Sequence, residues 1–453
     1  MTDTPSTPAA DAQPNEPTRL KRTFFQTLEL DIRMLGMVGA FVLISVGFQI
    51  LSGLRNSGGA NPIDWLLNGT FVTPRNIFNL TIQTVSVAIM ATGMVFIIVM
   101  RHIDLSVGAL LAFASAMMAM TQTLVMPGWL GIPLGSAWIA PVAIVVGVIT
   151  GMAVGALQGW LVGYLTIPAF IVTLGGYLVW RNVAWYLTSG QTIGPLDQNF
   201  QIFGGINGTL GEAWSWVFGA IAVAVTIWAM VRARRLKVAH DFPVKPIWGE
   251  FLLAAVAVVL VFGFVWILNS YEVPTARLAR DFAARGETMP DGYTTGYGIP
   301  ISVLVLVVVA VVMTVVAKRT RLGRYIFATG GNPEAAALAG INIRMLTVKL
   351  FMIMGALAAI SAVVASSRQT FHSNDIGTLD ELRVIAAAVI GGTAFAGGIG
   401  TIHGAILGAL IMQSLQSGMA MVGVDAPLQN IVVGMVLVIA VLIDTFYRKR
   451  AGV

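Results

Sequence analysis

Three polar side chains with the chemistry to bind a solute or a proton, His102, Asp104 and Ser106, interrupt one long apolar stretch. If that stretch crosses a membrane, such groups are costly there, and they usually face a cavity or a partner group. A simpler interpretation is that Asp104 caps a helix beginning at Leu105, because aspartate is a favoured N-cap residue. The two interpretations are compatible. We therefore predict all three as candidates for a translocation path.

Arg181 lies in the middle of the apolar run 174–187. An ionisable residue within a membrane helix is by default a functional candidate. A charge that pairs two helices is the alternative, so Arg181 joins the translocation candidates with both roles open. The other charged or titratable groups in or near apolar runs are expected to snorkel to the membrane surface; these are Arg368, Glu381, Arg383 and His403.

The segment 390–400 is dense in glycine, with five glycines among the ten residues 391–400. Such a run either lets helices approach closely or breaks a helix where it lines a cavity. The density favours a broken helix, which makes Gly391, Gly392 and Thr393 further translocation candidates. No acid or lysine accompanies them, so a phosphate site is poorly supported.

A basic, glycine-rich loop, 318–346, separates two apolar runs. Asn332 and Pro333 are typical of a helix start, Glu334 suits the positive helix end, and Gly340 suits a helix stop. The loop could be only a topology anchor, but a capped helix is more than anchoring requires, and we predict that it docks a partner. The candidate coupling residues are Gly323, Arg324, Gly330, Gly331, Asn332, Glu334, Ala335, Ala336 and Gly340.

The composition determines which elements must position these residues. Of 453 residues, 57% are hydrophobic and 11% are charged, against roughly 25% charged in soluble domains. The sequence therefore predicts an all-α, polytopic transmembrane helical bundle. The chain has no cysteine and no Gly-x-x-x-x-Gly-Lys-Ser/Thr phosphate loop, so no nucleotide site, cofactor or metal is expected.

We predict about twelve spans, with a disordered tail at 1–33, a transmembrane domain at 34–446 and a basic tail at 447–453. The pair at about 214–268 is among them. The predicted spans are 34–53, 77–100, 105–125, 139–163, 170–189, 214–231, 247–268, 299–317, 348–366, 384–400, 402–423 and 428–446.

Clusters of Lys and Arg mark the cytoplasmic ends of spans. They precede the first span and recur at 232–246, at 318–349 and in the C-terminal tail. One topology satisfies all four, and it places both termini in the cytoplasm. The net charge of +6 is thus explained by topology and calls for no nucleic acid.

Two segments, 155–172 and 408–428, share a weak sequence similarity that begins with Gly-Ala-Leu. In the predicted topology their helices run in opposite directions, as in an inverted repeat. Because Gly-Ala-Leu is common in membrane helices, chance similarity is the alternative.

Three motifs together resemble the permease subunits of bacterial monosaccharide ABC importers: the residues 102–108, the segment 323–340 and Ile-Gly-Gly-Thr at 390–393. The resemblance covers roughly 76–443. The resemblance implies a ten-span core, to which the pair of spans at about 214–268 is an addition similar to that of the longer xylose or multiple-sugar permeases. One departure is that Gly340 is not followed by the Ile-x-Leu-Pro ending of the wider importer motif, so the docking geometry of other importer classes is not transferred.

The resemblance implies a transport subunit of the bacterial inner membrane, not an enzyme, in a complex that imports a monosaccharide. Its implied partners are two cytoplasmic ATP-binding subunits, a periplasmic sugar-binding protein, a second copy of the permease and membrane lipid. Permeases for nucleosides or branched-chain amino acids remain alternatives. A secondary transporter driven by an ion gradient would need buried acids as coupling sites, and here Asp104 is the sole candidate near a span end. A membrane enzyme would need a metal or nucleophile–base constellation, and the sequence shows none.

Overall fold

A computed structural model describes residues 32–57 and 61–451. The tail predicted for 1–33 therefore lies almost wholly outside the described residues. Within those residues the secondary structure is helical, joined by turns and a few isolated β-bridges. The predicted all-α class is confirmed.

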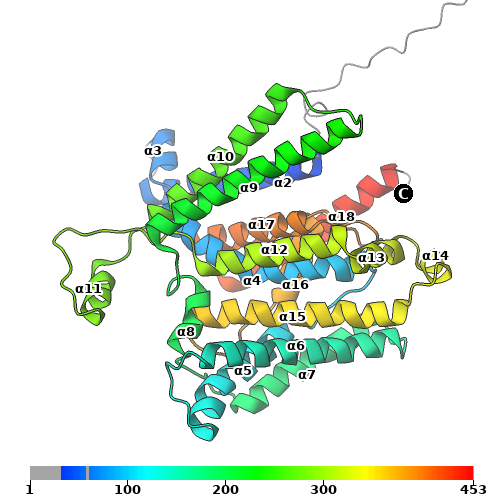
Figure 1. The fold of residues 1–453 in the computed structure, drawn as a ribbon, viewed down its shortest axis with the longest axis horizontal. Helices are drawn as coiled ribbons and strands as arrows, with labels where there is room; N and C mark the ends of the chain where they lie inside the picture. Colours follow the sequence, from blue (N-terminus) through cyan, green and yellow to red (C-terminus); the bar gives the residue numbers. More distant parts are fainter. Residues whose placement is uncertain (1–31, 58–60, 452–453) are drawn as a thin grey trace, which may run out of the picture.

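Long helices lie side by side in a bundle (Figure 1). They are α2 (Ile32–Ser57), α4 (Pro74–Val99), α5 (Val107–Met120), α6 (Ile139–Gly163), α7 (Ala169–Thr188), α9 (Gly211–Ala239), α10 (Ile247–Asn269), α12 (Ile301–Arg319), α15 (Ile343–Gln369), α17 (Ile402–Met421) and α18 (Ala426–Ala451). The short helices are α3 (Pro62–Leu67), α8 (Gln198–Gln201), α11 (Thr275–Ala284), α13 (Arg321–Gly331), α14 (Pro333–Leu338) and α16 (Asp380–Ile390). A π-helix, Thr121–Trp129, extends α5, and a 3-10 turn, Ile202–Gly204, follows α8.

The bundle has two ends, which we call the α14 end and the α11 end after the short helices found there (Figure 1). Helix α2 begins and helix α18 ends at the α14 end. This agrees with the predicted topology, in which the first and last spans have their outer termini on the same side.

Nine helices in the described part of the chain are long and apolar enough to cross a membrane, and each coincides with a predicted span. The predicted spans 170–189 and 428–446 correspond to α7 and to α18, whose apolar part is Ala426–Leu442. The span predicted at 384–400 is wrong as a full crossing. Helix α16 has 11 residues, about 16 Å at a rise of 1.5 Å per residue, which is half of a ~30 Å hydrocarbon core.

The glycine-dense segment explains why α16 stops. Gly391 ends the helix and packs directly on Gly404 of α17, where an added Cβ would overlap backbone atoms. Gly392 follows with φ +84°, a left-handed conformation that glycine adopts without steric cost. The broken helix predicted from the glycine density is therefore confirmed.

Helices α6 and α15 pack backbone against backbone. Glycines at every fourth position of α6 face α15, and an added Cβ would overlap carbonyl oxygens or α-carbons of that helix; they are Gly151, Gly155, Gly159 and Gly163. In a membrane, where no hydrophobic effect drives helices together, small residues make such close packing possible. The sequence interpretation used Gly155 and Gly159 only as part of a repeat and missed this role.

Helices α9 and α10 form the predicted extra pair and lean away from the bundle (Figure 1). Their buried residues are few: Ser215, Gly219, Gly249, Val265 and Leu268. The remaining apolar side chains are largely exposed. An ion pair of 2.9 Å between Arg234 and Glu250 joins the two helices at their α14 end.

The inverted repeat stays a prediction. Its two segments begin on α6 and α17, and these helices do run in opposite directions along the bundle (Figure 1). Opposite direction is necessary for such a repeat, but it is common among helices of any bundle.

Candidate functional site

Arg101, in the turn between α4 and α5, binds the end of α13. Its Nε donates to the Gly330 carbonyl and its Nη2 to the Gly331 carbonyl, both at 3.0 Å. Arg101 itself has a left-handed backbone, with φ +63°. The turn and the predicted coupling loop are thus joined by two charge-assisted hydrogen bonds.

The glycine-rich segment after α16 reaches the same place. The Gly398 N–H donates to the Val99 carbonyl at the end of α4, at 3.0 Å. Gly397 packs on the Gly330 carbonyl and on the Arg101 side chain, so that any added Cβ would collide with them. The turn just before the motif 102–108, the end of α13 within the segment 323–340 and the loop just after 390–393 therefore meet at one junction.

Helix α14 has the caps that the sequence predicted. The Asn332 side chain accepts from the Ala335 N–H at 3.0 Å, Pro333 is the first helical residue, and Glu334 lies in the first turn. Gly340 follows the helix with φ +83°. Ala336 is buried, whereas Ala335 and Glu334 are exposed.

Sequence interpretation missed Leu338, the last residue of α14, whose side chain is 90% exposed. Its signal was an apolar side chain within a capped helix of a polar loop. This leucine gives the short capped helix an apolar contact surface at the α14 end of the bundle (Figure 1).

The start of α13 is a tight elbow. Gly323 is buried and packs on the Val316 and Ala317 carbonyls of α12, and its N–H donates to Thr320 Oγ1 at 3.2 Å. Arg324 lies one residue further on and is exposed. The elbow turns the chain from α12 towards α14.

Asp104 does not cap a helix at Leu105, because α5 begins at Val107 with Ser106 as N-cap. Instead, Asp104 Oδ1 accepts from the Ser106 N–H at 2.8 Å and from Ser106 Oγ at 2.7 Å. Gln158 of α6 donates to Ser106 Oγ at 3.0 Å. Burial raises the pKa of the Asp104 carboxyl, and the bonds from Ser106 oppose that rise. The carboxyl fixes the turn from a position two residues before the N-cap of α5.

His102 lines a cavity of about 590 Å³ at the α14 end of the bundle. The cavity lies among the α4–α5 turn, the α6–α7 connection and the start of α15, with Arg101 and Arg344 in its lining. The imidazole packs near Phe351, with ring centroids 6.0 Å apart.

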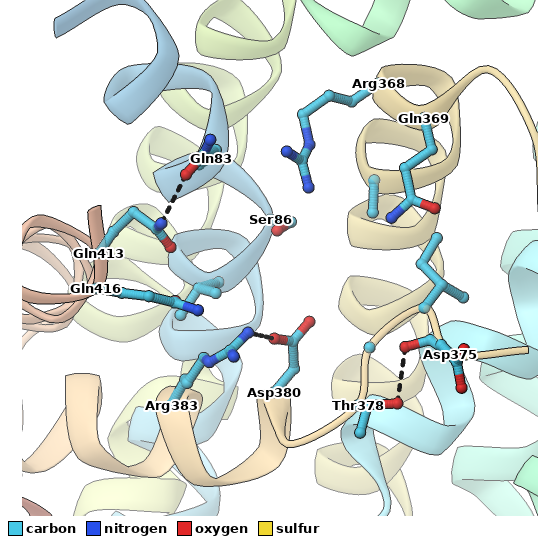
Figure 2. Close-up of a pocket in the computed structure, with 14 residues that line it drawn as sticks. Gln83, Ser86, Arg368, Gln369, Asp375, Thr378, Asp380, Arg383, Gln413 and Gln416 are labelled. Carbon is cyan, nitrogen blue, oxygen red and sulfur yellow. Dashed lines mark hydrogen bonds and ion pairs between the residues drawn. The ribbon is translucent and has the colours of Figure 1, made fainter. Parts of the chain in front are cut away.

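A polar cavity of about 280 Å³ lies within the bundle, between α4, α15, α16, α17 and the loop 370–379. Figure 2 shows amide and charged side chains pointing into it from all five segments. Its labelled lining residues are Gln83, Ser86, Arg368, Gln369, Asp375, Thr378, Asp380, Arg383, Gln413 and Gln416. Towards the α14 end, α4 is buried continuously from Val87 to Val99, so the apolar core closes that side.

Two pairs of side chains preorganise the lining (Figure 2). Gln413 donates to Gln83 at 2.8 Å, which joins α17 to α4. Arg383 forms a 2.9 Å ion pair with Asp380 one turn earlier in α16. The predicted snorkelling of Arg383 is therefore wrong, because its guanidinium pairs with Asp380 in the cavity lining. Arg368 also lines the cavity, but it is exposed in the last turn of α15, so its snorkelling stays a prediction. Glu381 is also buried, at 6% exposure.

None of the seven predicted translocation candidates lines this cavity. Arg181 reaches the loop 374–378 from outside, and Asp104 and Ser106 lie at the α4–α5 turn. Thr393 is buried beyond the end of α16. Their part in transport stays a prediction. No cluster of three metal-ligating side chains occurs in the part of the chain that the structure describes.

These features define the class of molecule: a membrane-embedded helical bundle with a polar cavity between its helices and a short, capped, exposed helix at one end. Residues 76–441 match the family described as branched-chain amino acid transport system / permease component. The xylose transport system permease protein of Haemophilus influenzae is 35% identical over 384 residues, which cover 84% of this chain and 92% of that protein. That of Escherichia coli K12 is 34% identical over 387 residues, or 85% and 89% of the two chains.

The ribose import permease protein of Escherichia coli K12 is 30% identical over 379 residues, which cover 83% of this chain and 88% of that protein. No solved structure matches the chain. The chain belongs to the permease-component family that residues 76–441 match. It is thus a transport component and a multi-pass inner-membrane protein.

Proposed function

We propose that the chain is the transmembrane permease subunit of an ABC importer that carries a monosaccharide across the bacterial inner membrane. Xylose or a related pentose or hexose is the first candidate substrate, because relatives that match most of the chain transport xylose and ribose by name. ATP hydrolysis takes place on separate subunits, and the permease itself performs no covalent chemistry.

The observation that carries the sugar assignment is the polar cavity. Its amides, carboxylates and guanidinium groups can both donate to and accept from hydroxyl groups. A branched-chain amino acid would need an apolar surface for its side chain. The lining favours a polyhydroxylated solute over that alternative.

The preformed Gln83–Gln413 and Arg383–Asp380 pairs favour weak binding of the transported solute over tight binding. These groups bond to one another when no solute is present, so a sugar must replace existing hydrogen bonds. The net gain of such an exchange is small. A weak site suits a permease that must release its solute.

The α14 end faces the cytoplasm in this proposal. Basic residues gather there in the helix ends and loops at 232–245 and 318–349, as the positive-inside preference requires. Helix α14, with the exposed Leu338, then docks into a cytoplasmic ATP-binding subunit. A periplasmic binding protein delivers the sugar at the α11 end, and a second copy of the chain completes the transmembrane part.

Movement of α14 is transmitted through the junction at Arg101. Because the guanidinium holds Gly330 and Gly331, a displacement of the docking helix pulls on the α4–α5 turn and on the glycine-rich segment. The permease needs two packings of similar free energy, with different contacts to the ATPase in each.

The test is uptake by proteoliposomes that contain the chain with its ATP-binding subunits and binding protein. We expect ATP-dependent uptake of a radiolabelled pentose or hexose, tested with xylose, ribose and glucose, and none of leucine or a nucleoside. A matched complex with a hydrolysis-deficient ATPase should be inactive. Uptake driven by a proton or sodium gradient in liposomes containing the chain alone would contradict the proposal.

A further inference from the structure

Arg181 of α7 holds one wall of the polar cavity from outside. Its Nη1 donates to the Asn374 carbonyl at 2.7 Å, to the Ile376 carbonyl at 3.2 Å and to Thr378 Oγ1 at 3.0 Å. We call residues 374–378 the wall segment, because four of its five residues line the cavity. One guanidinium nitrogen thus fixes the shape of that wall.

The rest of the guanidinium is incompletely satisfied. Arg181 Nε and Nη2 are buried and have no hydrogen-bond partner among the described residues. Buried N–H groups of a charged side chain are costly when unpaired. Arg181 therefore has bonding capacity that this arrangement does not use.

Glu381 also has a buried polar atom, in this case an acceptor, without a hydrogen-bond partner in the part of the chain that the structure describes. It is 6% exposed, and its Oε2 is buried without a hydrogen-bond partner in the described structure. The neighbouring carboxylate, Asp380, is already paired with Arg383. Glu381 lies three residues after Thr378, whose hydroxyl accepts from Arg181 at 3.0 Å. Arg181 and Glu381, each with buried polar atoms that have no hydrogen-bond partner in the described structure, therefore lie near the wall segment.

The wall segment lies between a fixed point and a bend. Upstream, His372 exchanges two backbone hydrogen bonds with Ile193, at 2.9 and 3.0 Å, and its ring contacts Ser115 Oγ at 2.9 Å. At its C-terminal end, Gly377 within the segment and Leu379 just after it have left-handed backbones, with φ +71° and +61°. Between these points Arg181 restrains the segment together with a 3.3 Å bond from Thr188 to Asn374, the burial of Ile376 and the packing of Gly377 on Gly108 of α5.

We propose that Arg181 and Glu381 are the two halves of a latch on the cavity wall. In the arrangement described, Arg181 holds the wall segment against the cavity. When the wall segment withdraws during transport, the guanidinium pairs with the Glu381 carboxylate and holds the second arrangement. This inference rests on the proposed transport function, and it makes Arg181 and Glu381 positioning residues that shape the cavity without lining it.

A mutant cycle in the reconstituted complex tests the latch. Arg181→Gln and Glu381→Gln should each lower maximal uptake about tenfold, and the double variant should be no worse than about tenfold, because residues in one network do not act additively. Arg181→Lys should restore part of the loss. Glu287→Gln, an exposed glutamate of the α11 loop, is the matched control and should transport normally. A loss of about a hundredfold in the double variant, the product of the two single losses, would overturn the latch.

A distance measurement keeps the test valid if Arg181→Gln fails to fold. The chain has no native cysteine, so Leu178→Cys on α7 and Asp375→Cys on the wall segment, both exposed, can carry two spin labels in the full complex. We expect the label distance to change between the nucleotide-free and ATP-trapped states, and Glu381→Gln to abolish that change. An unchanged distance, or a change that survives Glu381→Gln, overturns the latch. If the unmodified complex transports no sugar, the proposed function fails instead.

Discussion

The Arg101 guanidinium donates to the Gly330 carbonyl at 3.0 Å, although the two residues are 229 positions apart in the chain. This bond, with its neighbour to Gly331, joins the α4–α5 turn to the loop that presents α14. The loop proposed to dock the partner and the turn proposed to border the solute path are thereby joined. The relationship predicts that damage at Arg101 separates ATP hydrolysis from transport.

Arg101→Gln should raise the ATP hydrolysed per sugar transported, because the docking helix can then move without the α4–α5 turn. The side chain is largely exposed, so the loss of stability should be small, about 1 kcal/mol. Arg321→Gln, an exposed arginine of α13, is the control and should leave the ratio unchanged. Measuring both rates in the same proteoliposomes decides the point, and an unaltered ratio in Arg101→Gln would remove its coupling role.

Helix α14 should be the docking element. Leu338→Glu places a charge at the 90% exposed tip and should abolish binding of the ATP-binding subunits while the permease still inserts. Glu334→Lys opposes the helix dipole, and Gly340→Leu strains a left-handed position by about 1–2 kcal/mol, so both should impair ATP-driven uptake. The control is Leu236→Glu, an exposed leucine of α9. Retained co-purification of the ATPase with Leu338→Glu would refute the docking assignment.

The sequence predicted those elements whose causes are local. Apolar runs are long enough to define most spans, and the caps of α14 lie within nine residues of one another in the sequence. The end of α16 was also visible, because Gly391 and Gly392 can turn where other residues are strained.

The polar cavity could not be predicted, because its lining comes from five separate segments. Gln83 and Gln413 carry no charge and stand in apolar runs, so a search for ionisable groups passes over them. Arg368 and Arg383 were recognised as charges, yet only tertiary packing decides whether such a side chain turns to the surface or into a cavity.

The cavity amides should matter for transport more than for folding. Gln413→Leu removes the 2.8 Å bond to Gln83 and one sugar-bonding group, and a net hydrogen bond of about 0.5–1.5 kcal/mol corresponds to a loss of roughly two- to tenfold. We expect this loss in uptake at low sugar concentration. Gln429→Leu on α18, outside the cavity lining, is the control. Equal losses in the two variants would argue against a role for the cavity.

The Asp104 carboxyl should be required for folding or transport. Asp104→Leu leaves the buried Ser106 N–H without its 2.8 Å acceptor, at a cost of about 1–3 kcal/mol. Asp104→Asn retains a side-chain oxygen and should recover much of the stability. Thermal unfolding and uptake should be measured for both variants. Normal behaviour of Asp104→Leu in both assays would reduce this residue to a spacer.

The contact between α6 and α15 predicts that a Gly→Ala substitution lowers stability at this contact, although the same substitution does not lower it where the glycine has no close neighbour. Gly155→Ala puts a Cβ against the Phe351 carbonyl, and overpacking of this kind costs about 1–3 kcal/mol. Gly175→Ala on α7 meets nothing within 4 Å, and alanine's higher helix propensity favours it by up to about 1 kcal/mol. The same substitution should therefore lower the unfolding temperature of the purified protein at Gly155 and preserve or raise it at Gly175. If both variants shifted alike, the close packing of the two helices would not be what stabilises the bundle at that contact.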